Sequence, residues 1–560
     1  MRSHWLVFTL FMLSTTLQAQ VGGRFYNWYF GNKAGVNFSG GPPVAVTNGQ
    51  LVTTEGCAAI SDPAGNLLFY TDGVTVWNKN HLVMTNGTGL TGHASSTQSA
   101  VIVQKPLNSN IYYIFTADAD ASANGIRYSE VNLSLSGGLG AITINKNVPL
   151  VAPSCEKVVA VRHCNNRDIW IVTHDWNTNG FRTWLVSPAG ISGTPVVSNS
   201  GSVISGINQS KYGQLKTNNN GNKILAAHYG YTTGGINKVE LHDFNNSTGV
   251  VSGGFLLSNE TGVYGCEFSP NGRVAYAATN GGNLIQYNLC AGTNAAISAS
   301  RTLIASLGPF IGSLQIGPDN KIYVSRNSTS LSVINNPNTL GAGCGFVNAA
   351  IPLSGRNSGL GLPNMAALYN RPPIPPYTFN ANCLTVNFTS PTVSPLNNSC
   401  SSTGSAINSV SWNFGDPISG LSNTSTQLNP THVFSSIGAY QVQLILDLGC
   451  YKDTLLQTVN VTGFNLTMSS TATPCGASTG TATATPALPG TYTYLWSNGA
   501  TGQTITGLAA GVYNVTVTAS NGCTAIGSVN VPGGTNLNVI TNTTNISCFG
   551  GSNGAATATP

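Results

Sequence analysis

Charged side chains stand near the starts of strands that this sequence is expected to place around a central channel. They are Glu55, the adjacent Glu156 and Lys157, and Glu267. Carboxylates and an ammonium group gathered around a channel could bind a ligand there. Their positions relative to the preceding turns differ from strand to strand, so solvated polar residues around a funnel explain them as well. Both interpretations stay open.

Motifs of catalysis and of cofactor binding are weak. Gly476–Gly480 (GASTG) matches G-x-S-x-G, the nucleophile elbow of hydrolases, which requires a strand that turns sharply into a helix. Here a Thr–Ala strand pattern follows, and the motif returns at Gly550–Gly554, which indicates the turn of a repeat. The sequence has no C-x-x-C, H-E-x-x-H or P-loop pattern. We therefore expect a non-enzymatic protein without catalytic residues, metal ligands or cofactors.

Two histidines are followed directly by an aspartate, at His174–Asp175 and at His242–Asp243. Neighbouring side chains of a strand point to opposite faces, so such pairs make poor shared ligands of a metal ion. We expect both histidines to be plain hydrogen-bonding residues.

The elements that must position these residues form a repeat. From about residue 55 to 340, turns of Asn, Asp, Gly or Pro precede strongly apolar strands, as in Asp62–Gly65 before Leu67–Tyr70. The turns recur about every 51 residues, and units of this length with three or four strands are typical of propeller blades. The sequence thus predicts an all-β protein with a seven-bladed β-propeller over residues 24–370, closed by both ends of that region. The alternative fold for this region is a pair of β-sandwiches.

Composition supports a β-rich protein and excludes several functions. The chain has 560 residues with only 22 basic and 17 acidic side chains, and 41% of its residues are hydrophobic. So few charges do not build the surface of a helical protein, and so few basic residues do not form a face that binds nucleic acid. The apolar content excludes a disordered chain.

Several segments of residues 24–370 resemble the N-terminal propeller-like region of large surface proteins of gliding Gram-negative bacteria. PKD domains often follow the propeller in such proteins. The resemblance implies a cell-surface protein connected with attachment or gliding motility. The matching segments are Asn27–Asn32, Glu55–Ala58, Leu67–Trp77, Ser95–Ser99 and Gly361–Asn364.

A proline linker at residues 371–376 separates this region from further β modules. Residues 377–462 contain Trp412–Asp416 (WNFGD) and an alternating strand at Gly438–Leu444. They resemble a PKD domain, which is an Ig-like β-sandwich. The sequence departs from the family pattern at Asn413, commonly Asp, and at Pro417, commonly Gly.

Residues 463–534 are rich in Thr, Ala and Gly and resemble the SprB-type repeat of gliding-motility adhesins. The segments that carry this resemblance are Tyr492–Gly499, Leu508–Val517 and Asn521–Cys523. Residues 535–560 are expected to be the start of a second, truncated repeat. Further repeats and any sorting or anchoring domain are then expected beyond residue 560.

The first residues predict export. Arg2 and His4 precede the apolar run Trp5–Leu13, and small residues follow, as in a secretory signal peptide over residues 1–19. No later stretch is apolar enough to span a membrane as a helix. The expected location is therefore extracellular, secreted or at the cell surface.

The twelve cysteines of an exported chain are expected to form disulfides. Cys475 opens the first SprB-type repeat and Cys523 ends it, so we predict a Cys475–Cys523 bond. A second prediction, Cys383–Cys450, brackets the PKD-like sandwich.

Together these features predict an exported, adhesin-type surface protein. Its expected partners are extracellular polysaccharide, a surface, or other cell-surface proteins. The alternative is an extracellular protein that binds or degrades carbohydrate and uses the propeller as its site.

Overall fold

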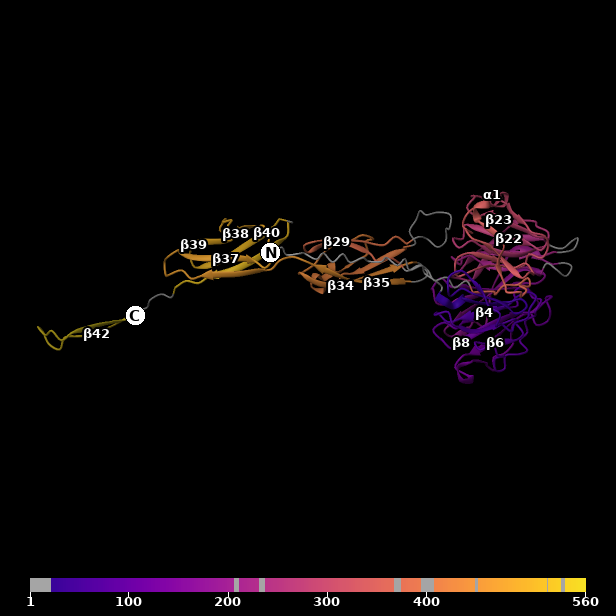
Figure 1. Cartoon of the computed structure of the whole chain (residues 1–560). Helices are drawn as coiled ribbons and strands as arrows, with labels where there is room; N and C mark the ends of the chain where they lie inside the picture. Colours follow the sequence, from indigo (N-terminus) through magenta and orange to yellow (C-terminus); the bar gives the residue numbers. More distant parts are fainter. Residues whose placement is uncertain are drawn as a thin grey trace, which may run out of the picture. The chain divides into compact units, whose positions relative to one another are not determined.

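The structure, a computed structural model, describes residues 22–205, 211–230, 237–366, 374–393, 407–448, 452–520, 522–534 and 539–560. The chain divides into two compact units (Figure 1). The first contains the described residues up to Ile374, and the second contains those of Pro375–Thr392 and Ile407–Pro560. The leader expected at residues 1–19, part of the linker at 371–376, and Cys450 lie outside the described residues.

The described residues are almost entirely β-strand. Besides one α-helix, α1 (Asn294–Ala299), the helical elements are the short 3-10 helices η1 (Gly22–Phe25), η2 (Ser136–Gly138), η3 (Gly341–Cys344) and η4 (Pro417–Asn423). None of the helices in this part of the chain is long and apolar enough to cross a membrane.

The first unit is a succession of antiparallel sheets whose strands are added in chain order. Apart from the sheet β1-β2-β3, the first strands of these sheets are β4 (Ala58–Ser61), β7 (Ala100–Gln104), β12 (Ser154–Arg162), β17 (Leu215–Thr217), β21 (Val263–Phe268) and β25 (Leu314–Ile316). The other strands of this unit are β1 (Asn27–Phe30), β2 (Ala34–Asn37), β3 (Val44–Ala45), β5 (Leu67–Thr71), β6 (Val76–Asn78), β8 (Ile111–Ala117), β9 (Ile126–Asn132), β10 (Ala141–Ile142), β11 (Val148–Val151), β13 (Ile169–Asp175), β14 (Thr178–Ser187), β15 (Gly190–Ile191), β16 (Val196–Ile204), β18 (Lys223–His228), β19 (Lys238–Asn245), β20 (Val250–Ser258), β22 (Val274–Thr279), β23 (Asn283–Asn288), β24 (Thr302–Ser306), β26 (Ile322–Val324), β27 (Ser330–Ile334) and β28 (Phe346–Pro352).

Hydrogen bonds near the starts of the first strands connect the sheets into a ring. The series begins at Gly56 and returns to Thr54 in the same segment before β4, so the first strands surround a common centre. This is the arrangement of a β-propeller, and it differs from the alternative fold, a pair of β-sandwiches. In ring order the bonds are Gly56 N to Ser96 O (2.9 Å), Thr97 N to Glu156 Oε2 (2.9 Å), Glu156 N to Lys211 O (3.2 Å), Gln214 N to Tyr264 O (2.8 Å), Leu314 N to Gln214 Oε1 (3.0 Å), Ser313 N to Leu360 O (2.7 Å) and Leu360 N to Thr54 O (2.8 Å).

The two ends of the first unit meet in this ring. Trp28 of β1 is fully buried and packs against Tyr323 of the last sheet, with ring centroids 5.5 Å apart. Just after β1, Asn32 forms bridges to both Val52 and Asn357. Because these bridges are single rather than a continuous ladder, the number of seven blades stays a prediction.

The second unit begins with a sandwich of two sheets, β29-β30-β33 and β32-β31-β34-β35, and two further sheets and a hairpin follow. Trp412 lies in the core of the first sandwich and Trp496 in the core of the next. The strands are β29 (Thr378–Asn382), β30 (Thr385–Thr389), β31 (Ser409–Asn413), β32 (Thr424–Ser425), β33 (Thr431–Val433), β34 (Gly438–Asp447), β35 (Lys452–Val461), β36 (Leu466–Thr471), β37 (Gly480–Pro486), β38 (Tyr492–Trp496), β39 (Thr504–Leu508), β40 (Gly511–Ala519), β41 (Thr524–Val531), β42 (Ile540–Thr544) and β43 (Ala555–Thr559).

The cysteine pairings predicted from the sequence are wrong. Cys383 forms a disulfide with Cys523, with Cα atoms 5.5 Å apart, and this bond excludes both Cys475–Cys523 and Cys383–Cys450. Cys383 lies in the turn between β29 and β30 and packs against the core that contains Trp496. The prediction failed because it assumed that each module is closed by its own cysteines, whereas this bond joins two consecutive modules.

Candidate functional site

Two of the four charged residues predicted to face a channel come together at the starts of the first strands. Glu55 lies just before β4 and is partly exposed, whereas Glu156 lies on β12 and is fully buried. Burial, and next the charge of Glu156, raise the pKa of Glu55 to about 8. The two carboxyl groups therefore influence each other across two sheets, as the channel interpretation requires.

Glu156 is held in place by three hydrogen bonds. Its Oε2 accepts from the backbone N and the Oγ1 of Thr97, at 2.9 and 3.2 Å, and its Oε1 accepts from the backbone N of Asp120 at 2.9 Å. Burial raises the pKa of Glu156 to about 7, although these donors favour the ionised form. Near neutral pH the cluster thus contains both protonated and ionised carboxyl groups.

Glu267 and Lys157 have structural roles instead. Glu267 lies near the end of β21, away from the strand starts, and pairs with Lys216 at 3.1 Å. The Lys157 ammonium donates to the backbone oxygens of Lys211 and Tyr212, at 2.9 and 2.6 Å. The interpretation of these two as ligand contacts therefore finds no support in their geometry.

Asp120 and Tyr212 join the site, and the sequence analysis missed both. Oδ1 of Asp120 accepts from the Tyr212 hydroxyl at 2.5 Å and pairs with the Lys211 ammonium at 3.0 Å. The hydrogen bond from Tyr212 is the main cause that keeps the pKa of Asp120 below its usual value. Neither residue belongs to the strand-and-turn repeat, so the spacing of the turns carries no signal for them. Glu55, Asp120, Glu156, Tyr212 and Tyr264 are called the carboxylate cluster below.

Tyr264, on β21, completes the cluster. Its side chain is buried, and among the described residues its hydroxyl has no hydrogen-bond partner at normal distance. Burial, and next the Glu55 charge, raise its pKa well above the usual value. A buried hydroxyl without a partner costs free energy, which a ligand or an ordered water would recover.

Aromatic rings lie beside the carboxylate cluster. The Lys211 ammonium is 5.9 Å from the ring centre of Trp176 and 5.7 Å from that of Tyr212. Tyr229 has its ring centroid 6.1 Å from Tyr212 and 6.2 Å from Tyr264. Trp176, Tyr212 and Tyr229 are all partly exposed, so flat apolar surface and carboxyl groups face solvent together.

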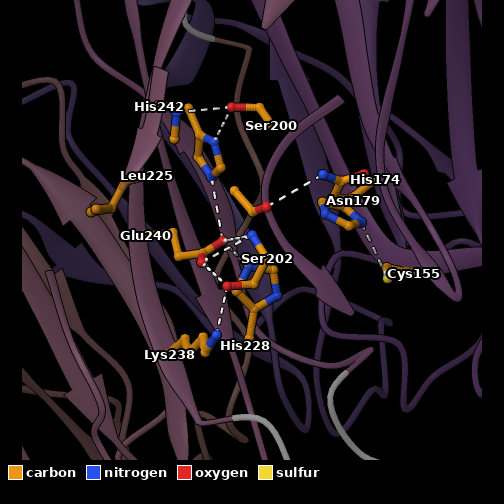
Figure 2. Close-up of polar contacts among 12 residues, drawn as sticks. Cys155, His174, Asn179, Ser200, Ser202, Leu225, His228, Lys238, Glu240 and His242 are labelled. Atoms are coloured by element: carbon orange, nitrogen blue, oxygen red, sulfur yellow. Dashed lines mark hydrogen bonds and ion pairs between the residues drawn. The ribbon is translucent and has the colours of Figure 1, made fainter. Parts of the chain in front are cut away.

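A second polar group, the histidine cluster, is buried between sheets of the first unit (Figure 2). Glu240 and His242 are two residues apart on β19 and share a face, and His228 of the neighbouring strand β18 lies diagonally opposite. The Nε2 atoms of His228 and His242 lie 3.6 and 3.8 Å from Glu240 Oε2. Ser200 Oγ lies 2.9 Å from His242 Nδ1.

The histidines of this cluster are neutral at physiological pH. Burial lowers the pKa of His228 and of His242 to about 4, although Glu240 favours their charged forms. Burial alone would raise the pKa of Glu240, but the neighbouring His228 ring and the hydrogen bond from Ser202 outweigh burial and lower this pKa to about 2. Within the described residues, no three His, Cys, Asp or Glu side chains are arranged to hold a metal ion.

The G-x-S-x-G motif lies in a turn. Gly476 has a φ of +72°, and the residues from Gly480 onward form strand β37 rather than a helix. The geometry of a nucleophile elbow is therefore absent at this motif.

Comparison with known proteins identifies one domain. The family model of the PKD domain matches residues 380–463. No curated protein sequence matches the chain at a significant level.

Similar solved structures are distant. A Bacteroides uniformis protein provisionally assigned as a 6-phosphogluconolactonase is 11% identical, with a TM-score of 0.31 over 72% of this chain and 95% of the other. Hydrazine synthase of Kuenenia stuttgartiensis is 13% identical, with a TM-score of 0.36 over 57% of this chain and 98% of the other. Likeness at this level carries no argument about activity.

Proposed function

We propose that this is an exported, cell-surface protein of the adhesin type, connected with surface attachment or gliding, that acts by binding rather than by catalysis. The PKD domain and the disulfide indicate an extracellular protein, because disulfides persist in oxidising compartments. The proposed role as an adhesin rests on the disulfide that joins two consecutive modules of the second unit.

The Cys383–Cys523 bond is the observation that carries this proposal. Tension applied along the chain enters the second unit before Cys383 and leaves it after Cys523. The bond spans a sequence separation of 140 residues, so it transmits that tension past the intervening strands. Such a crosslink suits a protein that must hold a load at a surface.

Two measurements on cells test the proposal. A membrane-impermeant biotin reagent should label the protein on intact cells, and deletion of the gene should reduce attachment to glass or to polysaccharide-coated surfaces. Attachment that is unchanged after deletion, or a protein labelled only in broken cells, would contradict it.

The carboxylate cluster favours a second candidate, an extracellular carbohydrate-binding or polysaccharide-degrading protein. A pair of carboxyl groups close enough to influence each other, as Glu55 and Glu156 do, is what most glycoside hydrolases use for catalysis. We expect purified residues 20–560 to release no reducing sugar from neutral or acidic polysaccharides. Release that is lost in both Glu55→Gln and Glu156→Gln would instead establish the enzymatic candidate.

A further inference from the structure

Tyr264 gives the carboxylate cluster a hydroxyl donor that the neighbouring Glu55 and Thr97 do not satisfy at normal hydrogen-bond distance, and Glu55 gives it a carboxyl group. Glu55 carries a proton at neutral pH because burial and the Glu156 charge hold its pKa near 8. A ligand that contacts both groups must offer oxygen acceptors.

Asp120 offers the complementary acceptor. Its side chain is 65% exposed, and its contacts with Tyr212 and Lys211 are both made through Oδ1. Among the described residues, Oδ2 is thus available to a hydroxyl group of a ligand. The cluster therefore offers both hydrogen-bond donors and an acceptor, which suits a ligand with several hydroxyl groups.

The charges of the site favour an uncharged ligand. The Lys211 ammonium is paired with Asp120, and the Lys157 ammonium is buried against two backbone oxygens. Neither is left to pair with an anionic ligand. A cationic ligand would find only Asp120 fully ionised, and that charge is already balanced.

The rings of Trp176 and Tyr212 supply the flat, partly exposed apolar surface that packs against the C–H face of a sugar ring. We propose that the carboxylate cluster and Trp176 form a binding site for an uncharged, pyranose-based glycan. This site names the class of ligand that the proposed surface protein would bind. Its role in attachment rests on the proposed function, whereas binding of the glycan does not.

The test measures binding of the purified chain, residues 20–560, to dextran, galactomannan and xylan by affinity electrophoresis and calorimetry, with polygalacturonate and chitosan as charged comparisons. At least one neutral polysaccharide should bind, and Asp120→Asn and Trp176→Ala should each weaken it by about tenfold or more. Asp243→Asn is the matched control for Asp120, because Asp243 is also exposed and paired with a lysine, Lys223, in the same unit. This control should bind as the wild type does, and melting temperatures should confirm that all variants fold.

A pH series supplies a second readout that a merely structural role would not change. The groups that face Glu55 are Glu156, Asp120, Tyr212, Tyr264 and Thr97. Ionisation of Glu55 removes a donor and adds repulsion toward Glu156, so binding should weaken above about pH 8. Glu55→Gln keeps an uncharged donor and should retain binding at pH 9.

The outcomes separate this proposal from the proposed function. Absence of binding to every neutral polysaccharide, preference for a charged one, or binding unaffected by Asp120→Asn and Trp176→Ala would overturn the glycan site, even if the cells still attach through the protein. Binding that is sensitive to these variants would support the site, even if the protein proved to be absent from the cell surface.

Discussion

Three histidine rings, His174, His228 and His242, are buried without charge inside the first unit. In the part of the chain that the structure describes, the ring nitrogens of His228 have no hydrogen-bond partner at normal distance, and this ring lies among Glu240, Lys238 and Lys157. Desolvation outweighs the attraction of the single carboxylate, so protonation is resisted in the folded state.

This cluster predicts loss of stability in acid. The pKa of His228 is about 4 in the folded protein and about 6.5 in the unfolded chain, so the unfolded chain binds more protons between these values. The free energy of unfolding of the first unit should therefore fall as the pH is lowered from about 6.5 to 4, by up to about 3 kcal/mol for this one residue. Melting curves recorded over this range measure the effect.

His228→Phe is the variant that isolates this contribution. The substitution removes two buried nitrogens without partners and keeps a ring of similar size. Its melting temperature should change little at pH 7 and should depend less on pH than that of the wild type. An identical pH dependence in both proteins would assign the acid sensitivity to other groups.

Asp416 of the PKD domain predicts a second residue-scale effect. The side chain is buried, and its carboxylate accepts from the backbone N and the Oγ of Ser435, at 2.8 and 2.5 Å, with His432 Nε2 at 3.3 Å. Burial alone would raise its pKa, but these donors outweigh burial and lower it. Asp416→Asn should destabilise the domain by about 2–3 kcal/mol, because hydrogen bonds to a charged acceptor are lost.

Hydrogen exchange of peptides spanning β31 and β34 in the full chain measures this change. Exchange should become faster in Asp416→Asn. It should stay unchanged in Asp453→Asn, a partly exposed aspartate on β35 of the same sandwich. Equal exchange in the two variants would show that Asp416 does not anchor the domain.

At the scale of elements, the turns explain why the repeat was readable from the sequence. The turns expected before the apolar strands do precede β5, β8, β13, β18, β22 and β26. At most of them a Gly or Asn adopts a positive φ, as at Gly65 (+94°) and Asn320 (+61°). Local turn chemistry fixes these hairpins, so a single sequence suffices to locate them.

The meeting of residues from different sheets could not be predicted in the same way. Asp120 lies in the loop between β8 and β9 and reaches Tyr212 only because the ring brings their sheets together. For the histidine cluster, the rule that adjacent residues face apart held for His242 and Asp243. It overlooked Glu240, two residues earlier on the same face, and register with β18 then added His228.

Leu107 is the exception among these turns and gives an element-scale prediction. It adopts a φ of +59° with its side chain 82% exposed. A left-handed conformation costs a branched residue about 1–2 kcal/mol, and glycine avoids this while losing about 0.5–1 kcal/mol of chain entropy. Leu107→Gly should therefore stabilise the first unit by about 0.5–1 kcal/mol.

The control for Leu107 is Leu82→Gly. Leu82 is also well exposed, at 62%, but it is not among the residues with a positive φ. Glycine there loses entropy without relieving strain, so the melting temperature should fall. A decrease in both variants would contradict the role given to the turn.

At the scale of the whole molecule, the disulfide decides how the second unit responds to force. Cys383 and Cys523 are joined across a sequence separation of 140 residues. While the bond is intact, the strands between the two cysteines cannot lengthen the chain even if they unfold. The PKD domain and the module after it therefore bear load as one unit rather than in series.

Single-molecule pulling of the full chain from its two ends measures this shielding. Unfolding of the intact protein should release no length from the residues between Cys383 and Cys523. In Cys383→Ser, or after reduction, those residues should add roughly 450–500 Å, because an extended chain spans about 3.3–3.6 Å per residue. Ser390→Ala, in the same sandwich but away from the bond, is the control and should behave as the wild type. Equal extension with and without the bond would show that load does not pass through it, and it would remove the main support for a load-bearing role.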